Sequence, residues 1–468
     1  MKNSNFSNRF ITVVRGVLPS PFTIAIFLSV ITVFSALFFT KPEQKSTSAY
    51  FFELLTWWEA GLWDSSTGGI YFAFQMMLML VLGHCLALTP PFENLIRQVL
   101  KYCTNSAKSA AIVAVIAIVL GLFNWGLGLV VSAILARKIG EKFSANKQPI
   151  NYSLVGAAAY LGMMVWHGGL SGSAPTKIME QGYLQELMMG FAHVNTPERI
   201  PLEATIGSNM NIFSILLLLI ILPTAVYWMG KKWKNEHLLQ LEQYKSKDDE
   251  LYESNSILLA ERLDHSIWLG KSVGVFLLMV CTISAFKYKG SDFFGFIQPN
   301  FINLFLFGLC LLFHRSILTF LNAVQTAIGD IAGILIQFPL YFGILGILKE
   351  SGLIIMFSNY MVDWANSDTL PFFTFISAGV VNFFVPSGGG QWAIQGPLII
   401  HVANEINADL PKSIMAMAYG DQLTNMLQPF WALPLLGITK LKAHQILPYT
   451  FVFFLLGAII FSVVITLF

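Results

Sequence analysis

The feature of this sequence that most restricts its fold is a set of apolar runs that are broken before they could cross a bilayer. The clearest break is Asn382–Gln391, with the sequence Asn-Phe-Phe-Val-Pro-Ser-Gly-Gly-Gly-Gln, flanked by apolar runs at Leu370–Val385 and Trp392–Val402. Proline followed by three glycines cannot continue a helix. At membrane depth, the backbone groups freed by such a break must be buried in protein or line a polar cavity. The segment therefore predicts a broken helix of the kind that forms binding sites in secondary transporters.

The composition indicates a polytopic membrane protein. Of 468 residues, 55% are hydrophobic and only 12% are charged, whereas a soluble domain carries about 25% charged residues. The formal net charge is +2, which gives no basis for attracting a polyanion, so nucleic acid is not expected as a partner. The four cysteines are scattered without metal-ligand spacing, and no nucleotide-binding or metal motif is found in the sequence. We therefore predict no cofactor and no metal site.

Uninterrupted and broken apolar runs alternate along the chain. Uninterrupted membrane helices are predicted at Phe22–Thr40, Gly69–Leu88, Met210–Met229, Ser266–Phe286, Phe301–Phe313, Ile331–Leu348 and Pro448–Phe468. Breaks are predicted at Asn124–Gly128, Trp166–Pro175, Asn382–Gln391 and Gly420–Asn425. The first run follows basic residues but is longer than the apolar core of a signal peptide, so we interpret it as a retained helix.

The two halves of the chain show the same order of a span, a glycine-broken hairpin, a second broken helix and a closing span. A hydrophilic stretch, Gly230–Asp264, separates them. We predict an N-terminal helix with an interfacial segment at 1–65, a first repeat at 66–229, a charged cytoplasmic connector at 230–265 and a second repeat at 266–468. The predicted fold class is an all-α polytopic membrane protein with two inverted repeats that contain broken helices and re-entrant hairpins.

Loop charges indicate that the repeats have opposite orientations. Basic residues lie on both sides of the first hairpin, at positions 97–108 and 137–147, whereas the loop Asn404–Leu410 after the third break lacks Lys and Arg. By the positive-inside rule, the first hairpin opens to the cytoplasm and the second to the outside. We expect a multi-pass protein of the bacterial inner membrane, with a cytoplasmic N-terminus and a periplasmic C-terminus.

The breaks contain the groups that a small anion requires. Free N–H groups and the positive end of the helix dipole attract negative charge at helix N-termini. No Arg or Lys lies inside a break, although Lys177 follows the second one, so a site of neutral donors suits a small monoanion. The candidate substrate-binding residues are Asn124, Gly126, Gly128, Ser171, Gly172, Ser173, Ser387, Gly388, Gly389, Gly390, Gln391, Asn425 and Gln428.

Asp421 is the only carboxylate inside a break. An acidic side chain in a membrane is costly and marks a functional site. Asp421 and Thr424 are therefore candidates for binding a coupling ion, Na⁺ or H⁺, and an N-cap role for Asp421 is the alternative. His84 and His167 could bind substrate or protons, but a single histidine near the end of a span is more often structural, and their roles stay open.

Each candidate also has a structural explanation. Glycines in apolar helices allow close helix packing, and Asn124 and Asn425 could act as helix caps. Trp392 and Trp431 flank breaks and could contact a short acyl chain or pack between helices.

At these motifs the chain resembles the bacterial short-chain fatty acid transporter family. The similarity runs nearly end to end and includes Leu18-Pro-Ser-Pro21, Asn124-Trp-Gly-Leu-Gly128, Gly168-Gly-Leu-Ser-Gly-Ser173, Pro386-Ser-Gly-Gly-Gly-Gln-Trp392, and Ala418-Tyr-Gly420 through Gln428-Pro-Phe-Trp-Ala-Leu-Pro434. The resemblance implies uptake of acetoacetate or butyrate, and more remotely the inverted-repeat ion transporter group, whose members often move by an elevator motion. Asp421 stands where the family usually has Glu, and His167 where a smaller residue is usual.

The resulting hypothesis is a secondary active transporter for short-chain fatty acids, coupled to H⁺ or Na⁺. A di- or tricarboxylate or amino-acid carrier of the same architecture is the alternative. A membrane enzyme is less favoured, because no catalytic constellation is found in the sequence. The expected partners are the carboxylate substrate and the lipid bilayer, and a homodimer is left open.

Overall fold

The computed structural model describes residues 21–63, 69–188, 196–233, 236–241, 261–288, 296, 299–329, 332–353, 355–356, 360, 364–428 and 430–468. Within these ranges the regular structure is helical, apart from one isolated bridge between Ile150 and His237. Five of the described helices are long and apolar enough to cross a membrane, and the bent pair Met77–Leu86 and Pro90–Leu100 would add a sixth. The chain is a multi-pass α-helical membrane protein, as its composition predicted.

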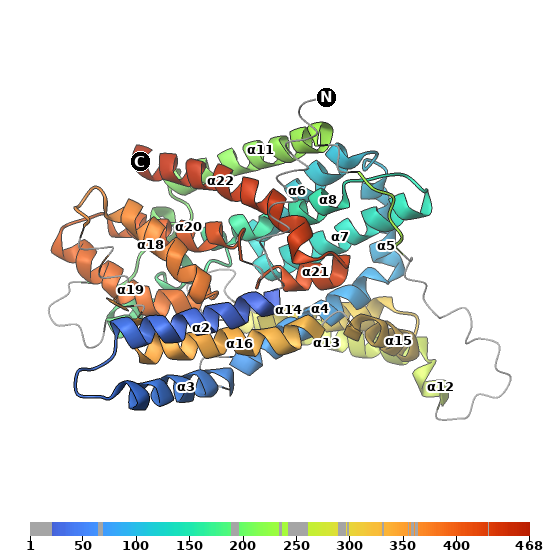
Figure 1. Ribbon diagram of the computed structural model, residues 1–468. Coiled ribbons are helices and arrows are strands. Elements are labelled where there is room, and N and C mark those ends of the chain that lie inside the picture. The colour runs from blue at the N-terminus through green and yellow to red at the C-terminus, as the bar shows by residue number, and fades with distance from the viewer. Residues whose placement is uncertain are drawn as a thin grey trace.

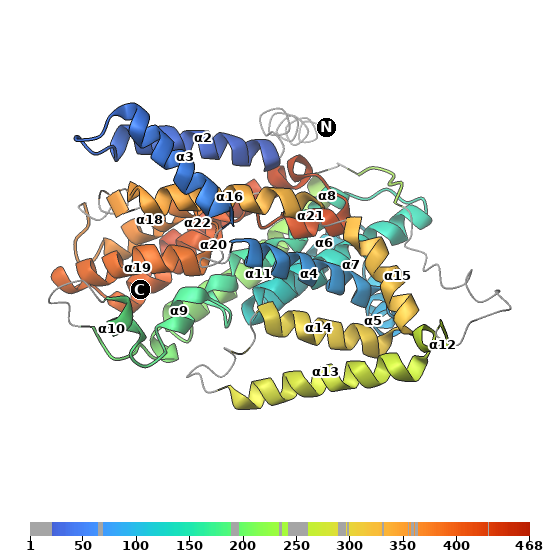
Figure 2. The same ribbon diagram turned by 90° about the horizontal axis from the view of Figure 1, so that it is seen from below.

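One group of helices flanks the rest of the molecule. It consists of α2 (Pro21–Phe39), α3 (Thr47–Trp63), α4 (Gly69–Ala87), α5 (Pro90–Leu100), α13 (Ile267–Lys287), α14 (Pro299–Phe313), α15 (Ile317–Ile328) and α16 (Ala332–Glu350). Figure 2 shows α2 and α3 along one edge and α13 along the opposite edge. Close approach of α3 to α16 requires glycine, because a Cβ added to Gly61 would lie 3.1 Å from the Cα atoms of Gly343 and Gly346. The N-terminal helices thus pack on the second half, and an interfacial position for α3 stays a prediction.

The first hairpin consists of α6 (Ser106–Phe123) and α7 (Trp125–Ala145). Asn124 ends α6 and begins α7, and its side-chain oxygen accepts a hydrogen bond from the Leu127 N–H at 3.0 Å. The two helices can turn back closely because Gly128 faces Gly121, where an added Cβ would lie 2.7 Å from the Gly121 nitrogen. The predicted break at Asn124–Gly128 is therefore the tip of a hairpin.

The second hairpin consists of α18 (Leu370–Phe384) and α19 (Gly388–Glu405), and its tip is the predicted break at Pro386 and the glycines. Ser387 is the N-cap of α19, where its hydroxyl accepts a hydrogen bond from the Gly390 N–H at 3.2 Å. In Figure 1 the first hairpin lies at the right of the molecule and the second at the left, so their tips point inward from opposite ends.

A broken helix follows each hairpin. After the first come α8 (Tyr152–Ala159), the 3₁₀ turns η1 (Leu161–Met164) and η2 (Trp166–Gly168), and α9 (Ser173–Lys177). After the second come α20 (Leu410–Thr424) and α21 (Leu433–Thr439). The predicted break at Gly420–Asn425 is wrong in its position, because α20 continues through Thr424 and the interruption follows it. Asp421 therefore lies inside α20 and is not a helix N-cap. The short elements α10 (Tyr183–Leu187), η3 (Leu202–Ala204) and α12 (Glu261–Asp264) lie in connecting segments.

The halves close with α11 (Asn209–Lys232) and α22 (Ala443–Leu467), which pack against each other along one edge in Figure 1. Hairpin, broken helix and closing helix thus occur twice in the same order, with the hairpins entering from opposite ends. The predicted fold class is confirmed in these respects. The domain boundaries stay a prediction, and residues 242–260 of the predicted connector lie outside the described residues.

Candidate functional site

The two hairpin tips meet on one segment, Val165–Ser173, which lies inside the first broken helix. At the first tip, the Trp125 N–H donates to the Ser171 hydroxyl at 3.1 Å, and the Leu170 N–H donates to the carbonyl of Leu122 at 2.8 Å. At the second tip, a Cβ added to Gly388 would lie 2.7 Å from the Trp166 ring and 2.9 Å from the ring of His167. We call this meeting point the junction.

A buried pair of a histidine and an aspartate side chain lies at the junction. The Nδ1 atom of His167 bonds the Oδ2 atom of Asp421, and both side chains are almost fully buried, at 0% and 1% exposure. The Ala174 N–H donates to His167 Nε2 at 3.1 Å. Because Nε2 accepts this bond, the ring proton of a neutral imidazole must reside on Nδ1 and be donated to the carboxylate.

The backbone on each side of this imidazole is fixed by α20 and α11. The Oε1 atom of Gln422 accepts hydrogen bonds from the N–H groups of His167 and Gly168, at 3.0 and 3.1 Å. The side-chain amide of Asn211 donates to the Gly168 carbonyl at 2.8 Å, and the Tyr419 hydroxyl donates to Asn211 Oδ1 at 3.0 Å. Hydrogen bonds from Gln422 of α20 and Asn211 of α11 therefore both fix the C-terminal end of η2.

A second buried polar cluster joins the end of α20 to the end of α18. The Asn382 amide nitrogen lies 2.8 Å from the Asp421 carbonyl oxygen, 2.9 Å from Thr424 Oγ1 and 2.9 Å from Asn425 Oδ1. The Gln428 amide donates to the carbonyl of Asn382 at 2.8 Å. These groups satisfy the carbonyls and hydroxyls that the breaks leave without helical partners.

The N-terminus of α19 is the more open part of the junction. Gly389 is exposed, and Ser173, Ser387 and Gly390 are partly exposed. A Cβ added to Gly389 would lie 3.8 Å from the Ser173 hydroxyl. Among the residues that the structure describes, no hydrogen-bond acceptor is found for the N–H groups of Gly388 and Gly389. This helix end therefore carries two N–H groups without an acceptor at the positive end of a helix dipole, of which Gly389 is exposed and Gly388 is buried.

The comparison with known families assigns the chain. A family model described as "Short chain fatty acid transporter" matches residues 3–468. The chain belongs to this family. A relative from Escherichia coli (strain K12) is 33% identical over 99% of both chains, and one from Haemophilus influenzae (strain ATCC 51907 / DSM 11121 / KW20 / Rd) is 33% identical over 98% of both. Each carries the name "Putative short-chain fatty acid transporter".

Two solved structures of transporters are also similar to this family member. The Alcanivorax borkumensis YdaH transporter has 15% identity and a TM-score of 0.41, with 96% of this chain and 98% of that chain covered. Neisseria gonorrhoeae MtrF, whose title describes a class of antimetabolite efflux pumps, has 14% identity and a TM-score of 0.35, with 97% of each chain covered. As a member of a transporter family, the chain is not expected to act by catalysis, in agreement with the sequence analysis.

The predicted site residues of this family member fall into two groups. The partly or fully exposed group contains Ser171, Ser173, Ser387, Gly389 and Gly390. The buried group contains Asn124, Gly126, Gly128, Gly172, Gly388, Gln391, Asp421, Thr424, Asn425 and Gln428. The structure therefore brings most candidates into one region but gives only some of them access to a solute.

Several buried candidates have structural roles. Gln391 donates to the Ala378 carbonyl at 2.8 Å and to Gln395 Oε1 at 2.7 Å, which ties α19 to α18. Gly126 faces Met79, where an added Cβ would lie 2.8 Å from the sulfur. Lys177 does not extend into the junction, because its ammonium pairs with Glu180 at 2.8 Å near the surface.

Sequence reasoning missed four residues that hold the junction together: Asn211, Asn382, Tyr419 and Gln422. Asn382 begins the most prominent break, and Gln422 directly follows Asp421. A buried side-chain amide in apolar surroundings needs hydrogen-bond partners. The position of an Asn or Gln next to an apolar run is therefore the sequence signal that could have identified Asn382 and Gln422. Asn211 lies near the start of the long helix α11, where nothing in the sequence distinguishes it from an ordinary first-turn residue.

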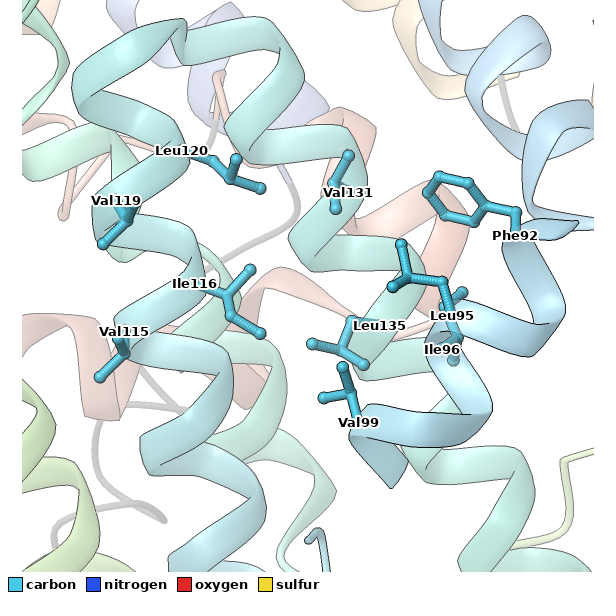
Figure 3. Close-up of a pocket in the computed structure, with 10 residues that line it drawn as sticks. All are labelled: Phe92, Leu95, Ile96, Val99, Val115, Ile116, Val119, Leu120, Val131 and Leu135. Atoms are coloured by element: carbon cyan, nitrogen blue, oxygen red, sulfur yellow. The ribbon is translucent and has the colours of Figure 1, made fainter. Parts of the chain in front are cut away.

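One large apolar cavity lies away from the junction. A cavity of about 490 Å³ between α5, α6 and α7 is lined by apolar side chains, among them Phe92, Leu95, Val131 and Leu135 (Figure 3). Within the described ranges, no group of three His, Cys, Asp or Glu side chains could hold a metal ion. His84 is buried in α4, and it takes part in none of the junction contacts described above.

Proposed function

We propose that this protein is a secondary active transporter that carries short-chain fatty acids, such as acetoacetate or butyrate, across the bacterial inner membrane. The observation that carries this proposal is the open N-terminus of α19. There the N–H groups of Gly388 and Gly389 have no acceptor among the described residues, and the Ser173 hydroxyl is close by. A carboxylate can accept hydrogen bonds from such donors without a cationic side chain.

The charges around the junction favour a substrate with one negative charge. Within the described part of the chain, no hydrogen bond or ion pair joins a Lys or Arg to His167, Ser173, Asp421 or the residues 387–391. A second carboxylate would lack a counter-charge near the buried Asp421, and like charges at short range repel strongly in a low dielectric. The alternative di- or tricarboxylate carrier is therefore less favoured.

Transport requires that the bound carboxylate move between the two sides of the membrane. The two hairpins, which approach the junction from opposite ends, are placed to close the site in turn (Figure 1). Coupling to an ion, H⁺ or Na⁺, at Asp421 and Thr424 is part of the proposal. A cytoplasmic N-terminus, a periplasmic C-terminus and re-entrant hairpins follow from the loop charges and also remain proposals.

The test is uptake of labelled butyrate or acetoacetate by the purified protein in proteoliposomes. Gly389→Leu should abolish uptake, because the new side chain fills the open space beside Ser173 without a close backbone contact. The matched control is Gly329→Leu, which adds the same side chain where a Cβ meets no atom within 4 Å. Competition by acetate and propionate, without competition by succinate, citrate or amino acids, is the expected specificity. Unchanged uptake by Gly389→Leu, or strong competition by succinate or citrate, would contradict the proposal.

A further inference from the structure

We infer that His167 and Asp421 together form a proton-binding site whose protonation strengthens the binding of a monocarboxylate. The inference rests on the proposed function, which it deepens by naming the coupling ion as H⁺ and His167 as part of its site. The two side chains come from different broken helices, η2 in the first half and α20 in the second, and they bond each other in the interior. A proton at this position therefore affects both halves.

The hydrogen bonds define the charge of the unloaded site. His167 Nε2 accepts from the Ala174 N–H, so the imidazole is neutral and donates from Nδ1 to an ionised Asp421. The pair then carries one negative charge, buried without a Lys or Arg partner among the residues that the structure describes. Adding one proton neutralises the pair, which removes the cost of burying an uncompensated charge.

The negative charge of the pair lies where the substrate carboxylate is proposed to bind. A Cβ added to Gly388 would lie 3.1 Å from Asp421 Oδ2 and 2.9 Å from the His167 ring, so the pair is adjacent to the first turn of α19. An ionised Asp421 therefore occupies the positive end of that helix dipole. Two unit charges roughly 6 Å apart, at an effective dielectric constant of about 20, change an affinity by about 100-fold. Proton binding should strengthen carboxylate binding by about this factor.

Protonation also changes a backbone contact. An imidazolium donates from both nitrogens, so protonated Nε2 cannot accept from the Ala174 N–H. The first turn of α9, which carries Ser173, must then shift relative to the ring. A proton that binds on His167 thus changes the position of a hydroxyl beside Gly389, whereas a proton that binds on Asp421 leaves this contact intact.

Few other ionisable groups face the pair. From α20 the ring is adjacent to Asp421, and Tyr419 lies near Gly168 with its hydroxyl bonded to Asn211 of α11. From α19 the neighbour of the pair is Gly388, and from α6 Leu122 contacts the following residues Gly169 and Leu170; none of these side chains ionises. On α9, Lys177 is paired with Glu180 near the surface. A dependence of carboxylate binding on proton concentration is therefore assigned to the His167–Asp421 pair.

The first experiment uses the unmodified protein. Calorimetric titration with butyrate at pH 7, in buffers of different ionisation enthalpy, counts the protons taken up with each bound carboxylate. We expect about one proton per carboxylate at a pH where the unloaded pair is ionised, and a roughly 100-fold tighter dissociation constant at low pH than at high pH. Binding without proton uptake would overturn the inference and leave the proposed function standing. Absence of binding for every short monocarboxylate would refute the proposed function itself.

The second experiment uses variants in proteoliposomes with a proton gradient or a Na⁺ gradient imposed separately. Empty liposomes give the passive flux of the protonated acid, which is subtracted. His167→Asn keeps a side-chain donor toward Asp421 but removes the imidazole base, so the pH profile of butyrate counterflow should differ from that of the unmodified protein and accumulation driven by the proton gradient should fall. His237→Asn, at an exposed histidine, is the matched control and should keep the wild-type profile. A wild-type pH profile in His167→Asn, or accumulation by the unmodified protein that follows only the Na⁺ gradient, would overturn the inference.

Discussion

Gln422 is the residue whose replacement tests the junction most directly. Its Oε1 atom accepts hydrogen bonds from the backbone N–H groups of His167 and Gly168, and the side chain is 1% exposed. Gln422→Leu removes this acceptor and leaves two buried donors unsatisfied. Each such donor costs about 1–3 kcal/mol, so the variant should destabilise the η2 segment by about 2–6 kcal/mol. At the lower limit of about 2 kcal/mol, the equilibrium constant for local opening of the η2 segment rises by roughly 30-fold.

Hydrogen–deuterium exchange measured by mass spectrometry on peptides that cover residues 161–175 should detect this change. Exchange should accelerate by roughly 30-fold or more in that region, while peptides from the α13–α14 pair keep their wild-type rates. If Gln422→Leu shows wild-type exchange in residues 161–175, the assignment of Gln422 as the support of His167 is wrong.

Three further predictions concern other parts of the site. Gly128→Ala should lower the free energy of unfolding by about 1–3 kcal/mol, because the added Cβ would lie 2.7 Å from the Gly121 nitrogen. Thermal unfolding in detergent measures this change, and an unchanged transition would contradict close packing of the hairpin. Asp421→Asn should remove the response of butyrate uptake to an imposed proton gradient, and a retained response in proteoliposomes would reject its coupling role. Lys177→Ala should change the affinity for butyrate less than twofold, because the ammonium pairs with Glu180 near the surface and makes no contact at the junction. Loss of this exposed pair should also cost only about 0–1 kcal/mol of stability, and a large loss of butyrate binding would show that Lys177 belongs to the site.

The two hairpin tips could be predicted from the sequence because their chemistry is local. Pro386 and the glycines that follow it separate α18 from α19, and Asn124 separates α6 from α7 as an N-cap. The break predicted at Gly420–Asn425 could not be placed in this way, because a single glycine does not end α20. Ser387 and Asn124 are N-caps, and for Asn124 this is the structural role that the sequence offers as an alternative. The existence of a polar centre at the second tip is therefore a consequence of short-range sequence.

The pairing of the breaks could not be predicted in the same way. His167 and Asp421 are 254 positions apart, and their contact depends on how the two halves pack. Asn425 and Gln428 remain candidates for substrate contact, and their side chains bond Asn382 at the end of α18, a partner that the sequence does not indicate. The direction of a side chain after a helix end is set by the turn geometry and by tertiary partners, neither of which a single sequence reveals.

The two hairpin tips differ in how firmly they are attached, and this difference matters for transport. The first tip is hydrogen-bonded to the junction through Trp125 with Ser171 and through Leu170 with Leu122. For the second tip, no hydrogen bond from residues 387–390 to residues 165–173 is found in the described part of the chain; contact there is by packing of Gly388 against Trp166 and the neighbouring ring. Withdrawing the second tip therefore breaks fewer hydrogen bonds, and its unbonded N–H groups gain partners only when an anion is present. If this reasoning holds, amides at the second tip exchange faster than those at the first, and added butyrate slows the second tip more than the first.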